Sequence, residues 1–278
     1  MKNMQNSKRK KIISIDLDGT LLRDNNDISK KTFKVLQKLS NMNNIIVVST
    51  GRSLIGIPKS IRDINFIDYY ITSNGTTCIN KNNNIIIRNW FDYEDIKDIT
   101  DDKHFLIEYL IYGKWYIDNT LNLSKIIKEQ EILEYIKKTR TLVNRDFFNL
   151  NHIIEKINVN FMEDDFNYAF NKINTFIKDK NLRCWSDKKH KLDIYSKSAN
   201  KGNTLKDLSN LLKIDSNNII AFGNDENDIE MLKYAQNSVA MINSSGNLKK
   251  VAKFVTTESN NNDGVSIFLN NYFDLNIY

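Results

Sequence analysis

The sequence predicts an α/β fold, in which a parallel sheet is flanked by helices and carries an inserted α+β module. Short apolar, β-branched runs alternate with helical segments near the start of the chain and again toward its end. This alternation is typical of parallel strands with helices on both faces of the sheet. The middle of the chain instead combines hairpin patterns with helices. At 278 residues, the chain can hold one large domain or two smaller ones.

The first elements follow from the spacing of apolar residues. Ile12–Ile15 is an apolar, β-branched stretch interrupted only by Ser14, as expected for a buried strand. An amphipathic helix is predicted at Ser29–Leu39, and two further strands at Ile45–Val48 and Phe66–Thr72. These segments give the strand–helix alternation of a parallel sheet.

The same alternation returns in the last part of the chain. We expect helices at Asn200–Leu212, Asp225–Tyr234, Leu248–Ala252 and Gly264–Leu269. Strands are expected at Ile219–Phe222, Ser238–Met241 and Phe254–Val255. Both ends of the chain therefore contribute to one α/β domain.

The middle of the chain follows a different pattern. Hairpins are predicted at His104–Tyr109 with Lys114–Asp118 and at Leu182–Ser186 with Lys191–Tyr195, an alternating segment at His152–Phe161, and helices at Lys125–Lys138 and Asp165–Lys178. Polar turns at Asn80–Asn84 and Asp187–Lys189 are the expected limits of this module. We therefore assign residues 1–81 and 189–278 to the α/β domain and residues 82–188 to an insertion. Trp90, Trp115 and Trp185 are expected in the core of the insertion.

Composition excludes several classes of protein. A hydrophobic content of 41% with 27% charged residues is typical of a globular chain. The formal charge of +6 is diffuse, so it suits small anionic ligands better than nucleic acid. Cys78 and Cys184 are too few and too distant for a disulfide framework or a zinc site. No apolar run is long enough to span a membrane, and Met1–Lys11 lacks a secretory signal, so we expect a cytoplasmic protein.

Two carboxylates follow the first strand directly. If the backbone stays extended through Asp16 and Asp18, both side chains project to the same side at the carboxyl end of the strand. Two like charges held this close are costly unless a cation or a shared proton relieves them. An acidic turn is the alternative, since Asp18-Gly19 is a common turn dipeptide.

Two further segments add groups that suit a phosphate. The second strand ends in Ser49-Thr50-Gly51-Arg52, whose hydroxyl and backbone N–H groups can hold phosphate oxygens. A plain strand-to-helix turn would look the same. Lys201 lies in the first turn of a predicted helix, where the helix dipole disfavours a cation. It is therefore either solvated or placed there for an anion.

The fourth segment is rich in oxygen ligands. Gly223–Asp228 holds two Asp, one Glu and two Asn directly after a predicted buried strand. This exceeds what a helix cap needs and suits oxygen ligation of Mg²⁺. The first, second and fourth segments all fall at carboxyl ends of strands, where open parallel sheets bind ligands.

With four such segments in this order, the chain resembles the haloacid dehalogenase (HAD) superfamily, and specifically the Cof-type phosphatases of subfamily IIB. The matching segments are Asp16–Thr20, Ser49–Arg52, Lys201-Gly202 and Gly223–Asp228, and Ser73–Gly75 is similar to the family's exit from the third strand. The resemblance implies a Rossmann-like core with an inserted C2-type cap.

The resemblance also implies roles for individual residues. Asp16 would attack phosphorus and form an aspartyl-phosphate, and Asp18 would protonate the leaving alkoxide and then activate water. The groups implied to bind the phosphate are Thr50, the N–H of Gly51, Lys201 and Asn227.

Mg²⁺ is the implied cofactor. We expect its ligands among Asp16, Asp18, Asn224 and Asp228. The chain departs from the family at Asn224, where the family usually has Asp. An amide carbonyl can ligate Mg²⁺ but removes one negative charge, which Asp225 or Asp228 could restore.

The expected function is Mg²⁺-dependent hydrolysis of small phosphorylated metabolites, such as sugar or nucleotide phosphates. The partner is thus a small molecule, with no nucleic acid or membrane, and the chain is expected to be a monomer or a weak homodimer. A phosphomutase of the same architecture is the nearest alternative. A catalytically weak phosphate-binding regulator is another, and the intact Asp16 and Asp18 pair argues against it.

Overall fold

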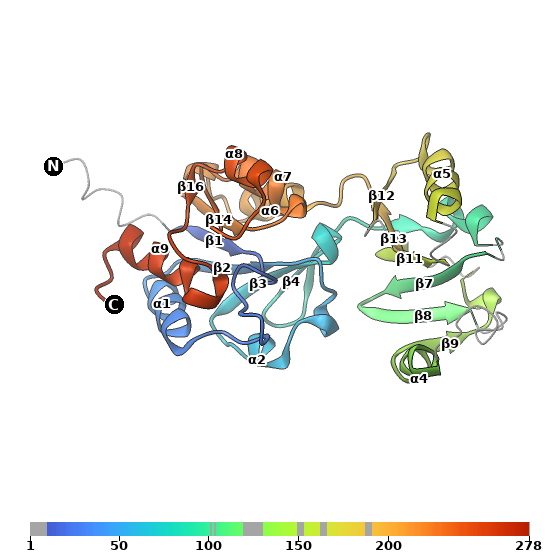
Figure 1. The fold of residues 1–278 in the computed structure, drawn as a ribbon, viewed down its shortest axis with the longest axis horizontal. Coiled ribbons are helices and arrows are strands. Elements are labelled where there is room, and N and C mark those ends of the chain that lie inside the picture. Colours follow the sequence, from blue (N-terminus) through green and yellow to red (C-terminus); the bar gives the residue numbers. More distant parts are fainter. Residues whose placement is uncertain are drawn as a thin grey trace. The chain divides into compact units, whose positions relative to one another are not determined.

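The computed structural model describes residues 10–100, 102, 104–118, 130–148, 153–161, 166–186 and 191–277 (Figure 1). The chain divides into two compact units. Unit 1 comprises Met1–Ile87 and Asn200–Tyr278, and unit 2 comprises Arg88–Ala199.

Unit 1 is built on a mostly parallel sheet. Its strand order is β16-β15-β14-β1-β2-β3-β4-β5, with β1 near the centre. Strands β16 through β3 in this order pair in parallel, whereas β4 pairs antiparallel with β3. The strands are β1 (Ile12–Ile15), β2 (Ile45–Ser49), β3 (Ile67–Thr72), β4 (Thr77–Asn80), β5 (Ile85–Arg88), β14 (Ile219–Gly223), β15 (Asn237–Ala240) and β16 (Phe254–Val255).

Helices cover both faces of this sheet. One face packs against α1 (Lys30–Asn41) and α9 (Gly264–Phe273), and the other against α6 (Lys201–Leu211), α7 (Ile229–Tyr234) and α8 (Gly246–Val251). Strand β1 shows the alternation that this requires, because Ile13 and Ile15 join the first cluster and Ile12 joins the second. The predicted α/β fold is therefore confirmed. A short helix, α2 (Lys59–Arg62), precedes β3.

Two features of unit 1 differ from the sequence expectations. The hairpin β4–β5 extends the sheet, and the polar Asn80–Asn84 segment that we took as a domain limit is its turn, where Asn80 N–H donates to Asn84 O. The expected helix at Asp225–Tyr234 begins as a 3₁₀ turn, η9 (Glu226–Asp228), before α7. The Asp225 side chain caps this turn.

Unit 2 contains a largely antiparallel sheet of order β12-β13-β11-β7-β8-β9. Its strands are β7 (Leu106–Ile111), β8 (Lys114–Asp118), β9 (Thr141–Val143), β11 (Lys156–Asn160), β12 (Leu182–Ser186) and β13 (Lys191–Ser196), beside the small pair β6 (Phe91–Asp92) and β10 (Ile153–Ile154). Its helices are α4 (Gln130–Thr139) and α5 (Phe166–Ile177). Both predicted hairpins are present. Residues 125–129 of the helix predicted at Lys125–Lys138 lie outside the described residues.

Short 3₁₀ turns connect many of these elements. Besides η9 they include η3 (Ser73–Gly75), Leu54–Gly56, Tyr93–Asp95, Lys97–Ile99, Arg145–Phe147, Ser216–Asn218 and Asn260–Asn262.

The two faces of the unit 2 sheet differ in character. One face carries apolar side chains, including Ile107, Ile157 and Ile194, that pack with α5. The opposite face carries a buried polar row, Glu108, Asn158 and Asp193, which the strand register places side by side. Buried charge is therefore present in this unit as well as in unit 1.

The limits of the insertion differ from our expectation of 82–188. The structural division places the limits at Arg88 and Ala199, because β5 joins the unit 1 sheet and β13 pairs with β11 and β12. A single sequence cannot reveal which sheet a short strand will join.

The tryptophans are also less buried than predicted. Trp90 and Trp115 are half-buried and Trp185 is exposed. His104 is exposed beside Asp102, whereas His152 and His190 lie outside the described residues. None of the helices in the described part of the chain has the length and apolarity needed to span a bilayer.

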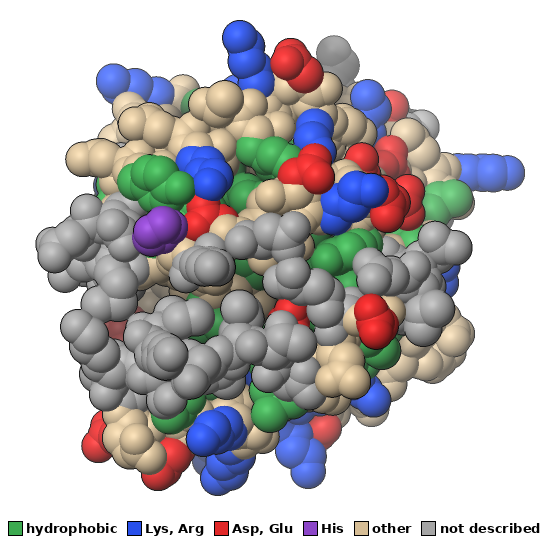
Figure 2. Space-filling model, turned by 90° about the vertical axis from the view of Figure 1, so that its right-hand side faces the viewer, with side chains coloured by type: hydrophobic (Ala, Val, Ile, Leu, Met, Phe, Trp, Pro, Cys, Tyr) green, Lys and Arg blue, Asp and Glu red, His purple; other side chains and the backbone are tan. Residues whose placement is uncertain are grey.

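Charge is mixed among the described residues on the face of the molecule that Figure 2 shows. In the view of Figure 2, the basic and acidic side chains of the described residues are interspersed rather than gathered by sign. This agrees with the diffuse formal charge of +6.

Candidate active site

A buried ion cluster lies at the carboxyl edge of the unit 1 sheet. Lys201 Nζ lies 2.6 Å from Asp16 Oδ1 and 2.7 Å from Asp228 Oδ1. The Lys201 and Asp228 side chains have no exposed surface, and Asp16 is also buried. Three of the predicted site residues are therefore brought together from β1, α6 and the turn after β14.

The local backbone explains why these side chains meet. Asp16 N–H donates to Phe222 O at 3.1 Å, which continues the β1–β14 ladder to the first catalytic candidate. Gly202 lets α6 approach the backbone of Glu230, because a Cβ there would lie only 2.4 Å from its carbonyl. This close approach places Lys201, at the first turn of α6, over the end of the sheet.

The backbone after β14 holds Asp228 in place. Asp228 Oδ2 accepts hydrogen bonds from the N–H groups of Asn224 at 2.9 Å and Asp225 at 3.1 Å. Gly223 leaves room for this side chain, since a Cβ there would lie 2.5 Å from the Asp228 Cβ. Asp228 is thus fixed by two backbone donors and one ammonium group.

The charges in the cluster perturb one another. Burial raises the pKa of Asp16, Asp228 raises it further, and Lys201 lowers it, so that the net shift is upward. Burial alone would lower the pKa of Lys201, but the attraction of Asp16 and Asp228 outweighs burial and raises it. Two carboxylates share a single ammonium group, and this excess of negative charge favours a further cation.

Asp18 lies apart from the cluster. Its carboxylate forms a bidentate ion pair with Arg52, in which one oxygen lies 2.9 Å from Nε and the other 2.5 Å from Nη2. The Asp18 side chain is 54% exposed. Arg52 also donates to Gly56 O and to Asn26 Oδ1. An exposed acid beside a buried one suits an exchange of protons with substrate or water.

The Thr50–Gly51 turn offers donors to an anion. Thr50 is fully buried, and its N–H donates to Ile71 O at 2.8 Å, which fixes the end of β2. In the described part of the chain, the Gly51 N–H donates to no other group. This N–H could therefore donate to a ligand.

Asn224 lies against the loop that carries Asp16 and Asp18. Its Oδ1 accepts a hydrogen bond from Thr20 Oγ1 at 3.2 Å. A Cβ on Gly19, whose φ is +72°, would lie 2.3 Å from Asn224 Nδ2, so only glycine fits there. Asn224 thus contacts the turn that follows Asp18.

The donor set fits a hard cation. Asp16 and Asn224 provide carboxylate and amide oxygens, the ligand type that Mg²⁺ prefers. Within the described ranges, no group of three or more His, Cys, Asp or Glu side chains is arranged to hold a metal. Mg²⁺ commonly keeps several waters in its shell, so a few protein oxygens can suffice to hold it.

The structure adds one neighbour that the residue-by-residue prediction missed. Asn227 Nδ2 donates to Asn74 Oδ1 at 3.0 Å, so that η3 and η9 meet beside Gly51. The signal was present in the sequence, since Ser73-Asn74-Gly75 follows a predicted strand.

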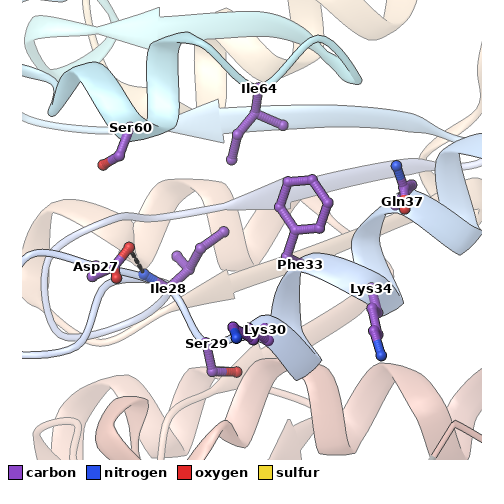
Figure 3. Close-up of a pocket in the computed structure, with 9 residues that line it drawn as sticks. All are labelled: Asp27, Ile28, Ser29, Lys30, Phe33, Lys34, Gln37, Ser60 and Ile64. Carbon is purple, nitrogen blue, oxygen red and sulfur yellow. Dashed lines mark hydrogen bonds between the residues drawn. The ribbon is translucent and has the colours of Figure 1, made fainter.

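A separate groove of about 390 Å³ lies near the start of α1. Phe33 and Ile64 face each other across it in Figure 3, with Lys30 and Lys34 on the helix. Its lining includes none of the predicted catalytic or phosphate-binding residues, so it is distinct from the ion cluster.

Comparison with known proteins agrees with this geometry. A family model described as haloacid dehalogenase-like hydrolase matches residues 13–269. A presumed phosphatase of Buchnera aphidicola subsp. Schizaphis graminum is 30% identical over 277 residues, covering 95% of this chain and 96% of the relative. A 5-amino-6-(5-phospho-D-ribitylamino)uracil phosphatase of Bacillus subtilis is 25% identical over 283 residues, covering 95% and 98%.

A solved structure shows the same fold. The HAD subclass IIB sugar phosphatase BT4131 superposes with a TM-score of 0.74 at 20% identity, covering 95% of this chain and 99% of that protein. The resemblance drawn from the four sequence motifs is thereby confirmed. The chain belongs to the haloacid dehalogenase-like hydrolase family and is a phosphatase of that family.

Proposed function

We propose that this chain hydrolyses small phosphorylated metabolites in a Mg²⁺-dependent reaction, through an aspartyl-phosphate formed on Asp16. The observation that carries the proposal is the buried cluster in which Lys201 contacts both Asp16 and Asp228. Such a cluster is costly for folding, because each charge loses its hydration. A catalytic role explains why the chain keeps it.

The phosphoryl group is bound at the edge of the sheet. Thr50 Oγ1 and the Gly51 N–H donate to its oxygens, and Lys201 offsets its charge. A carboxylate about 4 Å from one phosphate charge meets a repulsion of roughly 4 kcal/mol at an effective dielectric near 20. The buried ammonium of Lys201 reduces this barrier. Asn227, in η9, is a further group proposed to bind the phosphoryl group, and it contacts Asn74 beside Gly51.

In the first step an Asp16 oxygen forms a bond to phosphorus while the bond from phosphorus to the ester oxygen breaks. Asp18 gives its proton to that oxygen, so the product leaves as an alcohol. In the second step Asp18 takes a proton from water, which attacks phosphorus. The bond to Asp16 then breaks, and inorganic phosphate leaves.

Arg52 controls the position of Asp18 in this scheme. The ion pair with Arg52 holds the Asp18 carboxylate in its exposed position. Asp18 donates its proton from the protonated form, outside this pair, and Arg52 then pairs with the carboxylate that the donation leaves; the proton taken from water in the second step restores the acid. The exposure of the pair keeps such a movement inexpensive, because water replaces the lost contact.

Mg²⁺ would be held by oxygen atoms among Asp16, Asp18, Asn224 and Asp228. When bound, it would neutralise charge on the phosphoryl oxygens and stabilise the transition state. Asp228 already accepts hydrogen bonds from Lys201 and two N–H groups, so its contribution would be mainly electrostatic.

The proposed substrate class follows the names of two similar proteins. The names of the Bacillus subtilis relative and of BT4131 describe a phosphoribityl compound and a sugar phosphate as substrates of those proteins. We infer that this chain acts on small sugar or nucleotide phosphates of comparable size. The free Cys78 and Cys184 support the inference of a cytoplasmic location. A monomer or weak homodimer is the proposed state.

The test compares wild type with Asp16→Asn on a generic aryl phosphate and a panel of phosphorylated metabolites, with Mg²⁺ present. Release of inorganic phosphate is measured. Asp16→Asn should lower turnover by about 10⁴-fold or more, because an amide cannot form the acyl-phosphate. Asp207→Asn is a matched control, since Asp207 is exposed on α6 and should not change turnover.

Two outcomes would overturn the proposal. One is wild-type turnover by an Asp16→Asn protein that is free of contaminating phosphatase. The other is a folded wild-type protein that releases no phosphate from any ester on the panel at millimolar Mg²⁺. Transfer of the phosphoryl group to a second sugar hydroxyl, rather than to water, would instead identify a phosphomutase.

A further inference from the structure

Asn74 occupies an unusual backbone conformation beside the Thr50–Gly51 turn. It lies in η3 with φ 58° and ψ 32°, in the left-handed region, and the preceding Ser73 has φ 49°. Its N–H donates to Thr50 O at 3.0 Å, and the Ser73 N–H donates to Arg52 O at 2.8 Å. Two hydrogen bonds therefore tie η3 to the turn that is proposed to bind phosphate.

The side chain of Asn74 lies directly against Gly51. A Cβ placed on Gly51 would be 3.1 Å from Asn74 Oδ1 and 3.6 Å from Asn74 Nδ2. The Gly51 N–H has no partner in the described ranges, so a phosphoryl oxygen accepting from this N–H would lie close to the Asn74 amide. Asn74 is thus a neighbour of the proposed phosphate position.

The hydrogen bond from Asn227 determines which end of the Asn74 amide is available. Asn227 Nδ2 donates to Asn74 Oδ1 at 3.0 Å, which occupies the acceptor. Asn74 Nδ2 donates to no group among the described residues, although the side chain is only 9% exposed. It is therefore a donor that the fold holds in place and leaves for a ligand.

We propose that Asn74 binds a phosphoryl oxygen through Nδ2, and that Asn227 acts as a positioning residue by fixing the Asn74 amide. This inference rests on the proposed function, since it concerns the same phosphate position. It assigns a new binding residue, and it makes the effect of Asn227 on phosphate depend on Asn74. Donation to an anion is consistent with the chemistry of the site, because a carboxamide adds no charge that would repel phosphate.

The left-handed backbone conformation of Asn74 allows its side chain to be removed without straining η3. Glycine adopts the left-handed region without strain, so Asn74→Gly removes the side chain while it keeps the shape of η3. Asn74→Asp is a second variant that keeps the acceptor for Asn227 but lacks the Nδ2 donor. Asn43→Gly is the matched control, because Asn43 has φ 65° and is exposed in the turn after α1.

The first measurement is the binding of inorganic phosphate by calorimetry in Mg²⁺ buffer, alongside kcat and KM for an aryl phosphate. Asn74→Gly should weaken phosphate binding by about 10–100-fold, the scale expected for a hydrogen bond to a charged group. KM should rise more than kcat falls. Asn74→Asp should also weaken binding, and Asn43→Gly should leave both quantities unchanged.

The second measurement separates a binding role from a structural one. Asn227→Ala is made in wild type and in Asn74→Gly. If Asn227 acts through Asn74, it should weaken phosphate binding in wild type and have little further effect in Asn74→Gly. If Asn227 contacts phosphate by itself and Asn74 only supports the turn, the two losses should add.

Additive losses, or unchanged phosphate affinity in Asn74→Gly, would overturn the inference. Failure of the proposed function is a different result, namely a wild-type protein without turnover. Phosphate binding does not depend on turnover, so its loss in Asn74→Gly would still support the role of Asn74 in that case.

Discussion

Both units of this phosphatase bury charged side chains, but the pairing of carboxylates with cations differs between the two clusters compared below. In unit 1, two carboxylates, Asp16 and Asp228, share the single ammonium of Lys201. In unit 2, Glu108 pairs with Arg140 at 2.7 Å and Asp193 pairs with Lys156 at 2.9 Å. Glu108 and Asp193 are thus each paired with a cation, whereas the two carboxylates of the unit 1 cluster share one.

The charged residues of the two units also differ in where they lie along their strands. Glu108 and Asp193 lie within strands, and Asn158 and Asn160 donate to Glu108 at 3.3 and 3.4 Å. Asp16 lies just beyond the end of β1, in a loop that also carries the exposed Asp18. The comparison indicates that Glu108 and Asp193 are held by partners within their own sheet, while the position of Asp16 and Asp18 at the end of a strand is consistent with the proposed binding of a cation and a phosphate.

The largest expected difference concerns turnover. Asp18→Asn should lower kcat by about 10²–10⁴-fold, because the amide can neither donate nor accept the transferred proton. Glu108→Gln in unit 2 should leave kcat for a small aryl phosphate unchanged. Steady-state kinetics with Mg²⁺ measure both. A comparable loss of kcat in Glu108→Gln would mean that the unit 2 charges also serve catalysis.

The next prediction concerns stability and its dependence on metal. Lys201→Met should destabilise the protein by about 3–5 kcal/mol, because it leaves two buried carboxylates without their cation. Arg140→Met should destabilise unit 2, since Glu108 loses its guanidinium partner. Mg²⁺ should recover part of the loss in Lys201→Met by binding the folded state. It should recover none of the loss in Arg140→Met.

Denaturant titration can follow the two units separately. Trp90, Trp115 and Trp185, all the tryptophans of the chain, fall within the range of unit 2, so their fluorescence reports on that unit. Circular dichroism reports on the whole chain. Equal recovery by Mg²⁺ in both variants would contradict the proposed difference in charge balance.

A smaller effect is expected at Asn224. Asn224→Asp restores the carboxylate that is usual in the family and should lower the Mg²⁺ concentration for half-maximal activity by about 5–150-fold, which corresponds to roughly 1–3 kcal/mol. Asp207→Asn is the control, because Asp207 is exposed on α6 and is not among the proposed ligands. Kinetic titration with Mg²⁺ is the measurement. An unchanged requirement in Asn224→Asp would show that this position does not limit metal binding.

The smallest effect is a pH dependence of stability in unit 2. Burial alone would raise the pKa of Asp102, but hydrogen bonds from Lys172, His104 and Tyr168 outweigh it and hold the pKa well below its ordinary range. Asp102→Asn should therefore cost about 1 kcal/mol or less at neutral pH, since Lys172 is partly exposed and water screens the pair.

The sign of this pH dependence follows from the lowered pKa. A carboxyl whose pKa is depressed by folding stabilises the protein above its unfolded pKa of about 4 and loses this contribution as the pH falls further. The difference between wild type and Asp102→Asn should be constant near neutral pH and shrink below about pH 4. Tryptophan fluorescence in urea at several pH values measures it, and a gap that grew on acidification would contradict the assignment.

The sequence by itself determined the family and most of the unit 1 fold. Ile219–Gly223 is a continuous apolar run, and Ile12–Ile15 is interrupted only by Ser14, because both faces of a parallel strand are buried. Polar motifs at their carboxyl ends follow from the same geometry, since helices and loops leave that edge open to ligands. The placement of Asp16, Thr50 and Asp228 could therefore be expected without a structure.

Tertiary structure alone decided which polar groups pair. Lys201 meets Asp16 across 185 positions of the sequence, and Asn227 meets Asn74 across 153. The sequence likewise did not predict the ion pair between Arg52 and Asp18. Nor did it predict which sheet β4, β5 and β13 join. Local propensity and periodicity describe a residue's own segment, whereas hydrogen bonds and ion pairs depend on which distant segment folding brings within a few ångströms.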